Sequence, residues 1–314
     1  MQQRFNVPAF ARTAGGAALA IVTLAALTAC GGGGGDNTPA TVSTMSVGAM
    51  KYGTPGLVTI NGTHLGNLSL TASGCKNVTR LTAAPTASTD TTAYFSCTPS
   101  GAYTSTISAV TNGATVSSQP LTVQPPIVQM TVSGGGGGSV NGTIVFKLMG
   151  DKAPITVDNF LAYVNSGFYD GLDKKGATIF HRVVPGFVVQ GGGYGAATSG
   201  TLPAVKATPF APISLELTGG SNVQWTATMA RTADANSATS QFFFNLVNNS
   251  ASLDKSASTA GYAVFADVSG SAAVIQAIAA AAPCTALLSD GTPLQDGSCV
   301  PVPNVTITSA TQTQ

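Results

Sequence analysis

The stretch FHRVVPGFVVQGG, residues 180–192, decides the fold of the C-terminal part of this chain. It is rich in valine and phenylalanine, and Pro185-Gly186 at its centre is a turn signal. The pattern therefore predicts two strands, over residues 178–184 and 187–190. Successive side chains of a strand point to opposite faces. His181 and Arg182 therefore cannot face the same site: if Arg182 faces a groove, His181 faces the interior or another layer.

Further strands and two helices are expected around this stretch. Residues 127–132 and 142–148 predict a hairpin, with the glycine run 134–138 at its tip. Apolar residues at helical spacing predict helices over 154–165 and 271–282, with Pro283 as the stop of the second. Other strands are expected at residues 226–229, 241–245, 262–268 and 304–308. Many strands with two helices indicate a closed β-barrel capped by two helices.

Polar and aromatic side chains in these strands are candidates for a binding site. Arg182 stands among apolar residues, where its five fixed donors suit a carbonyl or carboxylate partner. The alternative for Arg182 is a structural salt bridge. Gln241 and Phe243 lie two residues apart and share one face of a strand, and Gln190 supplies a second amide. An apolar pocket with a few placed polar groups is typical of a small-ligand site.

Several longer stretches, in order, resemble the cyclophilins, which are peptidyl-prolyl cis–trans isomerases. Besides residues 180–192 these are MART at 229–232 with NSATSQFFFN at 236–245, LD at 253–254 followed by GYAVF at 261–265, and APITVDNF at 153–160 with GFYDG at 167–171. The resemblance covers residues of about 127–310. It implies a cyclophilin-like closed β-barrel and an isomerase that needs no cofactor and no metal.

The resemblance also implies a role for each candidate residue. Arg182 is the catalytic donor to the proline nitrogen. Phe187, Val188, Phe243 and Leu253 form the proline pocket, Gln190 and Gln241 orient neighbouring carbonyl groups, and Ala230, Arg231 and Thr232 line the groove for the preceding residues. Tyr262 stands where many relatives carry histidine, and we interpret it as a variant of the same site.

The sequence departs from the family pattern at four places. Ser252 precedes the Leu-Asp pair, where relatives carry Trp or Phe, an aromatic residue that supports cyclosporin binding, and the preceding segment is one residue longer. Val188 replaces a usual methionine, Trp225 stands where relatives often have glycine, and residues 172–177 lengthen a loop. We expect a shallower pocket, and a packing role for Trp225.

The first 39 residues predict export and a lipid anchor. A basic start with Arg4 and Arg12, an apolar core at 14–26 and LTAC at 27–30 are typical of a lipoprotein signal over residues 1–29. Cys30 would carry the lipid, and residues 30–39 would form a glycine-rich tether. By resemblance, glycine after Cys30 favours the outer membrane. We therefore expect a lipid-anchored protein of the bacterial cell envelope that faces the periplasm.

Residues 40–124 predict a separate β-sandwich. Short alternating stretches and Asn-Gly turn signals at 61–62 and 112–113 indicate antiparallel strands. The segment 53–65 resembles the opening of an immunoglobulin-like IPT/TIG domain. The boundary is expected at residues 123–126, because Pro125-Pro126 cannot continue a ladder of strand hydrogen bonds.

Four further cysteines predict two disulfides in an exported chain. Four cysteines allow three pairings, and neighbourhood in sequence favours Cys75 with Cys97 and Cys284 with Cys299. A zinc site is disfavoured, because the chain holds only two histidines and no Cys-x-x-Cys pair.

The composition limits the possible partners. Charged residues make up 8% of the chain and the net charge is +1, which argues against nucleic acid because phosphate binding needs clustered basic residues. We expect a monomeric isomerase that acts on proline-containing unfolded or envelope proteins. One alternative is a proline-peptide binding module with little turnover. Another makes the sandwich the functional part, as a scaffold or carbohydrate-binding unit.

Overall fold

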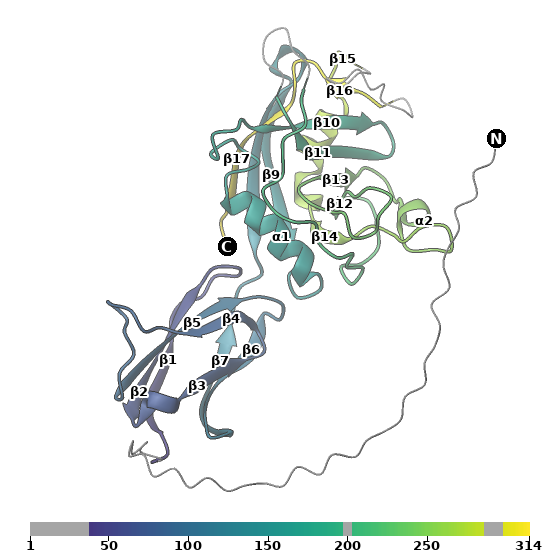
Figure 1. Ribbon diagram of the computed structural model, residues 1–314. Coiled ribbons are helices and arrows are strands. Elements are labelled where there is room, and N and C mark those ends of the chain that lie inside the picture. The colour runs from purple at the N-terminus through teal and green to yellow at the C-terminus, as the bar shows by residue number, and fades with distance from the viewer. Residues whose placement is uncertain (1–37, 197–202, 286–297) are drawn as a thin grey trace, which may run out of the picture. The chain divides into compact units, whose positions relative to one another are not determined.

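The computed structural model describes residues 38–196, 203–285 and 298–314 of the chain (Figure 1). The predicted signal segment and Cys30 lie outside these ranges. Strands dominate the described part, and no helix within it is long and apolar enough to span a lipid bilayer.

Residues 41–122 form two antiparallel sheets. One has the order β1-β2-β5-β4 and the other β3-β6-β7. Apolar residues of both sheets, among them Val58, Ile60, Phe95 and Ile107, are buried in one cluster, as the alternating sequence predicts. The strands are β1 (Thr41–Val47), β2 (Gly56–Thr63), β3 (Ser69–Ala72), β4 (Cys75–Arg80), β5 (Thr92–Pro99), β6 (Thr104–Thr111) and β7 (Ala114–Thr122), with a 3-10 turn, η1 (Leu65–Asn67), after β2.

The two Asn-Gly pairs of this region differ in structure. Asn112 and Gly113 both have positive φ and join β6 to β7, as the turn prediction requires. The prediction of a turn at residues 61–62 is wrong, because both residues lie inside β2. Gly62 is needed there for close packing: a Cβ atom on it would lie 1.9 Å from the carbonyl oxygen of Thr41 in β1.

Residues 127–312 contain a closed eight-stranded barrel in the order β10-β11-β13-β12-β14-β9-β8-β17. Its interior is filled by aromatic rings, and Phe242 lies edge-on to Phe146, Phe160 and Phe180. The prediction of a mainly β chain with a cyclophilin-like closed barrel is confirmed. The strands are β8 (Ile127–Gly134), β9 (Val140–Leu148), β10 (Thr178–Val184), β11 (Val188–Gly195), β12 (Thr226–Met229), β13 (Phe242–Asn245), β14 (Val264–Asp267) and β17 (Thr306–Gln312).

Two helices pack on the barrel. The helix α1 (Pro154–Asn165) has the predicted bounds and contacts β17, and α3 (Ala272–Ala279) contacts β9. The prediction placed the end of the second helix three residues too late. The helix ends before Pro283, which has no N–H to continue the hydrogen-bond pattern and restricts the residue before it.

Several smaller elements complete the described residues. The predicted glycine tip between β8 and β9 is present as a 3-10 turn, η2 (Gly136–Gly138). A 3-10 turn, η3 (Ser269–Ser271), precedes α3. A short helix, α2 (Ser250–Leu253), was not predicted. A two-stranded hairpin pairs β15 (Cys284–Thr285) with β16 (Val300–Pro301). Both predicted disulfides are present, Cys75–Cys97 and Cys284–Cys299.

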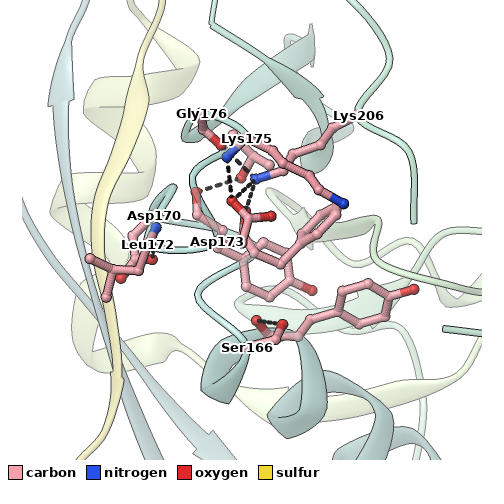
Figure 2. Close-up of polar contacts among 11 residues, drawn as sticks. Ser166, Asp170, Leu172, Asp173, Lys175, Gly176 and Lys206 are labelled. Atoms are coloured by element: carbon pink, nitrogen blue, oxygen red, sulfur yellow. Dashed lines mark hydrogen bonds and ion pairs between the residues drawn. The ribbon is translucent and has the colours of Figure 1, made fainter. Parts of the chain in front are cut away.

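The lengthened loop between α1 and β10 is held by a buried lysine (Figure 2). The Lys206 ammonium donates hydrogen bonds to the carbonyl oxygens of Phe168 at 2.6 Å and Gly176 at 2.5 Å, and to the Asp173 carboxylate at 3.0 Å. It also lies 4.5 Å from the centre of the Phe168 ring, within the range of a cation–π contact. These contacts connect the lengthened loop to a segment beyond β11.

Candidate active site

Nine of the predicted site residues line one cavity of about 250 Å³. They come from β10, β11, β13, α2 and the loops that follow β10, β12 and α2, so the site forms only when the barrel closes. The lining residues are Arg182, Phe187, Val188, Gln190, Ala230, Arg231, Phe243, Leu253 and Tyr262.

One part of the cavity wall is apolar. Val184, Val188, Phe243 and Leu253 form a buried cluster of their own, separate from the barrel core, and Phe187, Ala230 and Tyr262 pack against it. Strand alternation explains the separation, because Phe242 and Phe244 point into the barrel while Phe243 points to the cavity. Such walls suit the ring of a proline or another compact apolar group.

A chain of polar groups crosses one wall of the cavity. Arg182 and Gln190 are opposite each other in the pairing of β10 with β11, and Gln190 is opposite Phe243 of β13. Arg182 Nη1 donates to Gln190 Oε1 at 3.3 Å, and Gln190 Nε2 donates to Gln241 Oε1 at 2.9 Å. Because a guanidinium can only donate, it requires Gln190 to present its oxygen, and this orients both amides.

His181 lies on the opposite face of β10, as the alternation predicts. It is 3% exposed and its ring lies 4.4 Å from that of Tyr194. Burial lowers its pKa to about 4, and the nearby Arg182 charge acts in the same direction. His181 is therefore neutral at pH 7 and does not line the cavity.

A second cavity of about 280 Å³ adjoins the first and shares Gln190, Ala230 and Arg231 with it. It holds the two predicted residues that the first cavity lacks, Thr232 and Gln241. Ser237 and Thr239 also line it, and the sequence analysis missed them although both lie within the stretch 236–245. The sequence signal that could have identified them is the alternation of their two hydroxyl side chains with small residues before Gln241.

Arg231 lines both cavities, and Tyr262 lines the first. Arg231 Nε donates to the Gly261 carbonyl oxygen at 2.9 Å, and its guanidinium carbon lies 4.3 Å from the centre of the Tyr262 ring. Tyr262 in turn meets Phe243 edge-on, with ring centres 5.9 Å apart. The tyrosine thus contributes an apolar face to the cavity and a π face to the arginine.

Hydrogen bonds of asparagine side chains support the segments that line the cavity. Asn249 Nδ2 donates to the Phe187 carbonyl oxygen at 2.9 Å and to Asn245 Oδ1 at 2.8 Å. The carboxylate of Asp254 accepts hydrogen bonds from the backbone and side-chain nitrogens of Asn222, both at 2.8 Å. Asn222 and Asn249 were not predicted, because Asp254 and Phe187, the partners that connect them to the site, lie 32 and 62 residues away.

Two of the departures from the family pattern have a physical account. Ser252 is exposed on α2 and does not line the cavity, so the rim lacks an aromatic side chain at this position. Trp225 has a φ of 64°, a left-handed conformation that glycine adopts without strain, which explains the glycine of relatives. Trp225 packs against the barrel core and does not line the cavity.

Comparison with known proteins identifies similar chains. Residues 127–312 match the family model of the cyclophilin-type peptidyl-prolyl cis-trans isomerase/CLD. The chain is 47% identical over 128 residues to peptidyl-prolyl cis-trans isomerase A of Dickeya dadantii, an alignment that covers 40% of this chain and 60% of the relative. It is 45% identical over 139 residues to a peptidyl-prolyl cis-trans isomerase of Acinetobacter baylyi, covering 44% and 67%, and 45% identical over 132 residues to peptidyl-prolyl cis-trans isomerase B of Escherichia coli, covering 41% and 73%.

Proposed function

The chain belongs to the cyclophilin-type peptidyl-prolyl cis–trans isomerase family, and we propose that its barrel catalyses rotation about Xaa-Pro bonds in proline-containing proteins. The observation that carries this proposal is the place of Arg182, which lines a cavity beside an apolar cluster and the amides of Gln190 and Gln241.

The reaction needs neither a nucleophile nor a proton transfer. The peptide C–N bond has partial double-bond character, and rotation must cross a barrier of about 20 kcal/mol. At the top of the barrier the amide is twisted and its nitrogen lone pair is localised. A donor placed at that nitrogen stabilises the twisted form more than either planar form, and this difference is what raises the rate.

The residues of the two cavities divide this task. Val188, Phe243 and Leu253 hold the proline ring, and Gln190 and Gln241 bind carbonyl groups beside it. Arg182 then donates to the proline nitrogen. The apolar groups around Arg182 lower the local dielectric constant. The interaction of its guanidinium with the proline nitrogen is therefore stronger than it would be in water.

The test is an isomerisation assay on a short proline peptide with the full chain and its Arg182→Ala variant. The variant should keep its fold and lose about 100-fold or more of its rate constant, as removal of one transition-state donor typically does. Arg80→Ala, which changes an arginine of β4 outside the barrel, is the matched control and should keep full turnover. A folded Arg182→Ala protein with unchanged turnover would falsify the mechanism.

A binding module with little turnover is the second candidate, because the same cavity can hold a proline without accelerating rotation. The isomerisation assay separates the two. If peptides bind to the intact protein and Arg182→Ala does not alter a negligible rate, the binding function is correct.

We further infer an anchored site of action, in which Cys30 carries lipid and the isomerase acts on exported or envelope proteins. The sequence LTAC at 27–30 supports this inference. Cys30→Ser should abolish membrane fractionation and leave the turnover of purified protein unchanged. Recovery of unmodified Cys30 from membrane-bound protein would contradict the lipid anchor.

A further inference from the structure

Arg182 lies in β10, and one edge of β10 pairs with β11 over most of its length. The other edge of β10 has two different partners. On this edge β17 pairs only with the first part of β10, through Ile179 with Thr306, and through a hydrogen bond of 3.0 Å from the Phe180 N–H to the Val305 carbonyl oxygen. The part of β10 that carries Arg182 lies beyond this contact.

Cys299 takes the place of β17 beside that part. The Val183 N–H donates to the Cys299 carbonyl oxygen at 2.8 Å, and the Cys299 N–H donates to the Val183 carbonyl oxygen at 3.0 Å. This is a complete antiparallel pair, and it is adjacent to Arg182 in sequence. An unpaired strand edge would otherwise be exposed at this point of β10.

Cys299 is held in this position by a small hairpin that a disulfide closes. Cys299 is bonded to Cys284. Next to this bond β15 pairs with β16 (Figure 1). Val300 of β16 is buried against Ile179 of β10, in a cluster separate from the barrel core. Two strands of two residues each provide few hydrogen bonds. The Cys284–Cys299 disulfide therefore contributes much of the stability of this hairpin.

The position of β10 controls the donor geometry of the site. Arg182 Nη1 lies 3.3 Å from Gln190 Oε1, near the upper limit for a hydrogen bond, so a small displacement of β10 breaks the contact. The proline pocket depends only in part on this edge. Val184 of β10 belongs to its apolar cluster, but Val188 comes from β11, Phe243 from β13 and Leu253 from α2.

We propose that the Cys284–Cys299 disulfide is a positioning element of the active site: it holds Cys299 against Val183 and thereby fixes Arg182. The proposal rests on the isomerase function proposed above. Reduction by a dithiol transfers two electrons and two protons to the bond, gives two thiols, and leaves the reductant as a disulfide. The Arg182 part of β10 then loses its second partner, and turnover falls while peptide binding is retained.

The test compares two double variants of the full chain on a short proline peptide. Cys284→Ser/Cys299→Ser should lower kcat by about 3- to 100-fold, the range expected when a catalytic group is displaced by up to about 1 Å. KM should stay within about twofold, because the pocket remains. Cys75→Ser/Cys97→Ser removes the other disulfide, which lies outside the barrel. This variant should keep the full kcat of the parent protein.

A double-mutant cycle distinguishes positioning from general destabilisation. In an Arg182→Ala background, loss of the Cys284–Cys299 bond should have no further effect on kcat, since the group that it positions is already gone. An equal loss in both backgrounds would overturn the proposal, as would an unchanged kcat in the folded double-serine variant.

A reversible version covers a double-serine variant that fails to fold. The Cys75→Ser/Cys97→Ser protein is treated with dithiothreitol and then reoxidised, and kcat should fall and recover. Hydrogen exchange at the Val183 amide gives a readout independent of turnover: it should accelerate on reduction, while exchange at Phe243 should not. If the Val183 amide is equally protected before and after reduction, the proposal is refuted, whether or not the protein has measurable isomerase activity. A lack of isomerase activity by itself would refute only the proposed function.

Discussion

Replacement of Lys206 by methionine removes a buried charge and keeps an unbranched side chain. The ammonium donates to the carbonyl oxygens of Phe168 and Gly176 and to the Asp173 carboxylate, and the Lys206 side chain is 4% exposed. Removal of one partner of a buried ion pair costs about 3–5 kcal/mol. The Asp173 side chain is 17% exposed and regains water, so we expect the free energy of unfolding to fall by about 3 kcal/mol, at the lower end of that range.

Urea denaturation followed by fluorescence measures this loss in the barrel alone. Trp225 is the only tryptophan of the chain and lies just before β12, so its emission reports unfolding of the barrel. Lys175→Met is the matched control, because Lys175 is an exposed lysine of the same loop, and its effect should stay within about 0.5 kcal/mol.

The pH dependence provides a second measurement on the same cluster. Burial by itself raises the pKa of Asp173, but hydrogen bonds from the Lys175 N–H and from Lys206, with the charges of both lysines, outweigh it and lower the pKa below the ordinary value of 3.8. The stabilisation is therefore complete above that value and is lost as the pH falls through the lower, folded-state pKa. Lys206→Met should reduce this acid sensitivity. A variant within about 1 kcal/mol of the parent at pH 7 would refute the assignment of Lys206 as the clamp of the loop.

Three further predictions concern the site and its surroundings. Gly193→Ala should raise KM and keep the fold, because its Cβ would lie 2.4 Å from Gln241 Cδ, a flexible side chain that can move; an unchanged KM in peptide kinetics would show that the Gln241 amide does not bind substrate. Ser252→Trp should strengthen cyclosporin inhibition by about 1–3 kcal/mol of apolar burial with little change in turnover, and nanomolar inhibition of the parent protein would show that another side chain fills the rim. The free energy of unfolding should fall by about 3 kcal/mol as the pH drops from 6.5 to 4, because the folded-state pKa of His181 is about 4 and the unfolded chain binds the proton more readily. His181→Phe, which keeps a ring against Tyr194, should flatten that slope in pH-dependent denaturation, and an unaltered slope would exclude His181 as its source.

Much of the barrel follows from local sequence. Alternation predicted that Arg182 and His181 face opposite sides of β10, and the structure confirms it, with His181 buried and Arg182 in the cavity lining. The bounds of α1 were predicted because Pro154 fixes its start and the apolar spacing follows one face. Both disulfides follow from closeness in sequence.

Local sequence patterns are misleading where the partner of a residue is distant in the chain. Asn61-Gly62 has the composition of a turn, but β2 is paired on both sides, and the glycine serves the close approach of Thr41. The start of α1 is similar: the N–H of Thr156 is capped by the Glu216 carboxylate at 2.9 Å, which no local pattern announces.

The sequence by itself determined which residue types form the site and which face of each strand they occupy, because side-chain alternation and turn chemistry are local properties of the chain. Only the tertiary structure decided what supports them: Cys299 beside Val183, Lys206 within the loop before β10, and Asn249 behind Phe187. Each of these contacts joins segments far apart in the chain. Strand order and loop closure bring such partners together when the whole barrel packs. The pattern of neighbouring residues in the sequence therefore does not predict them.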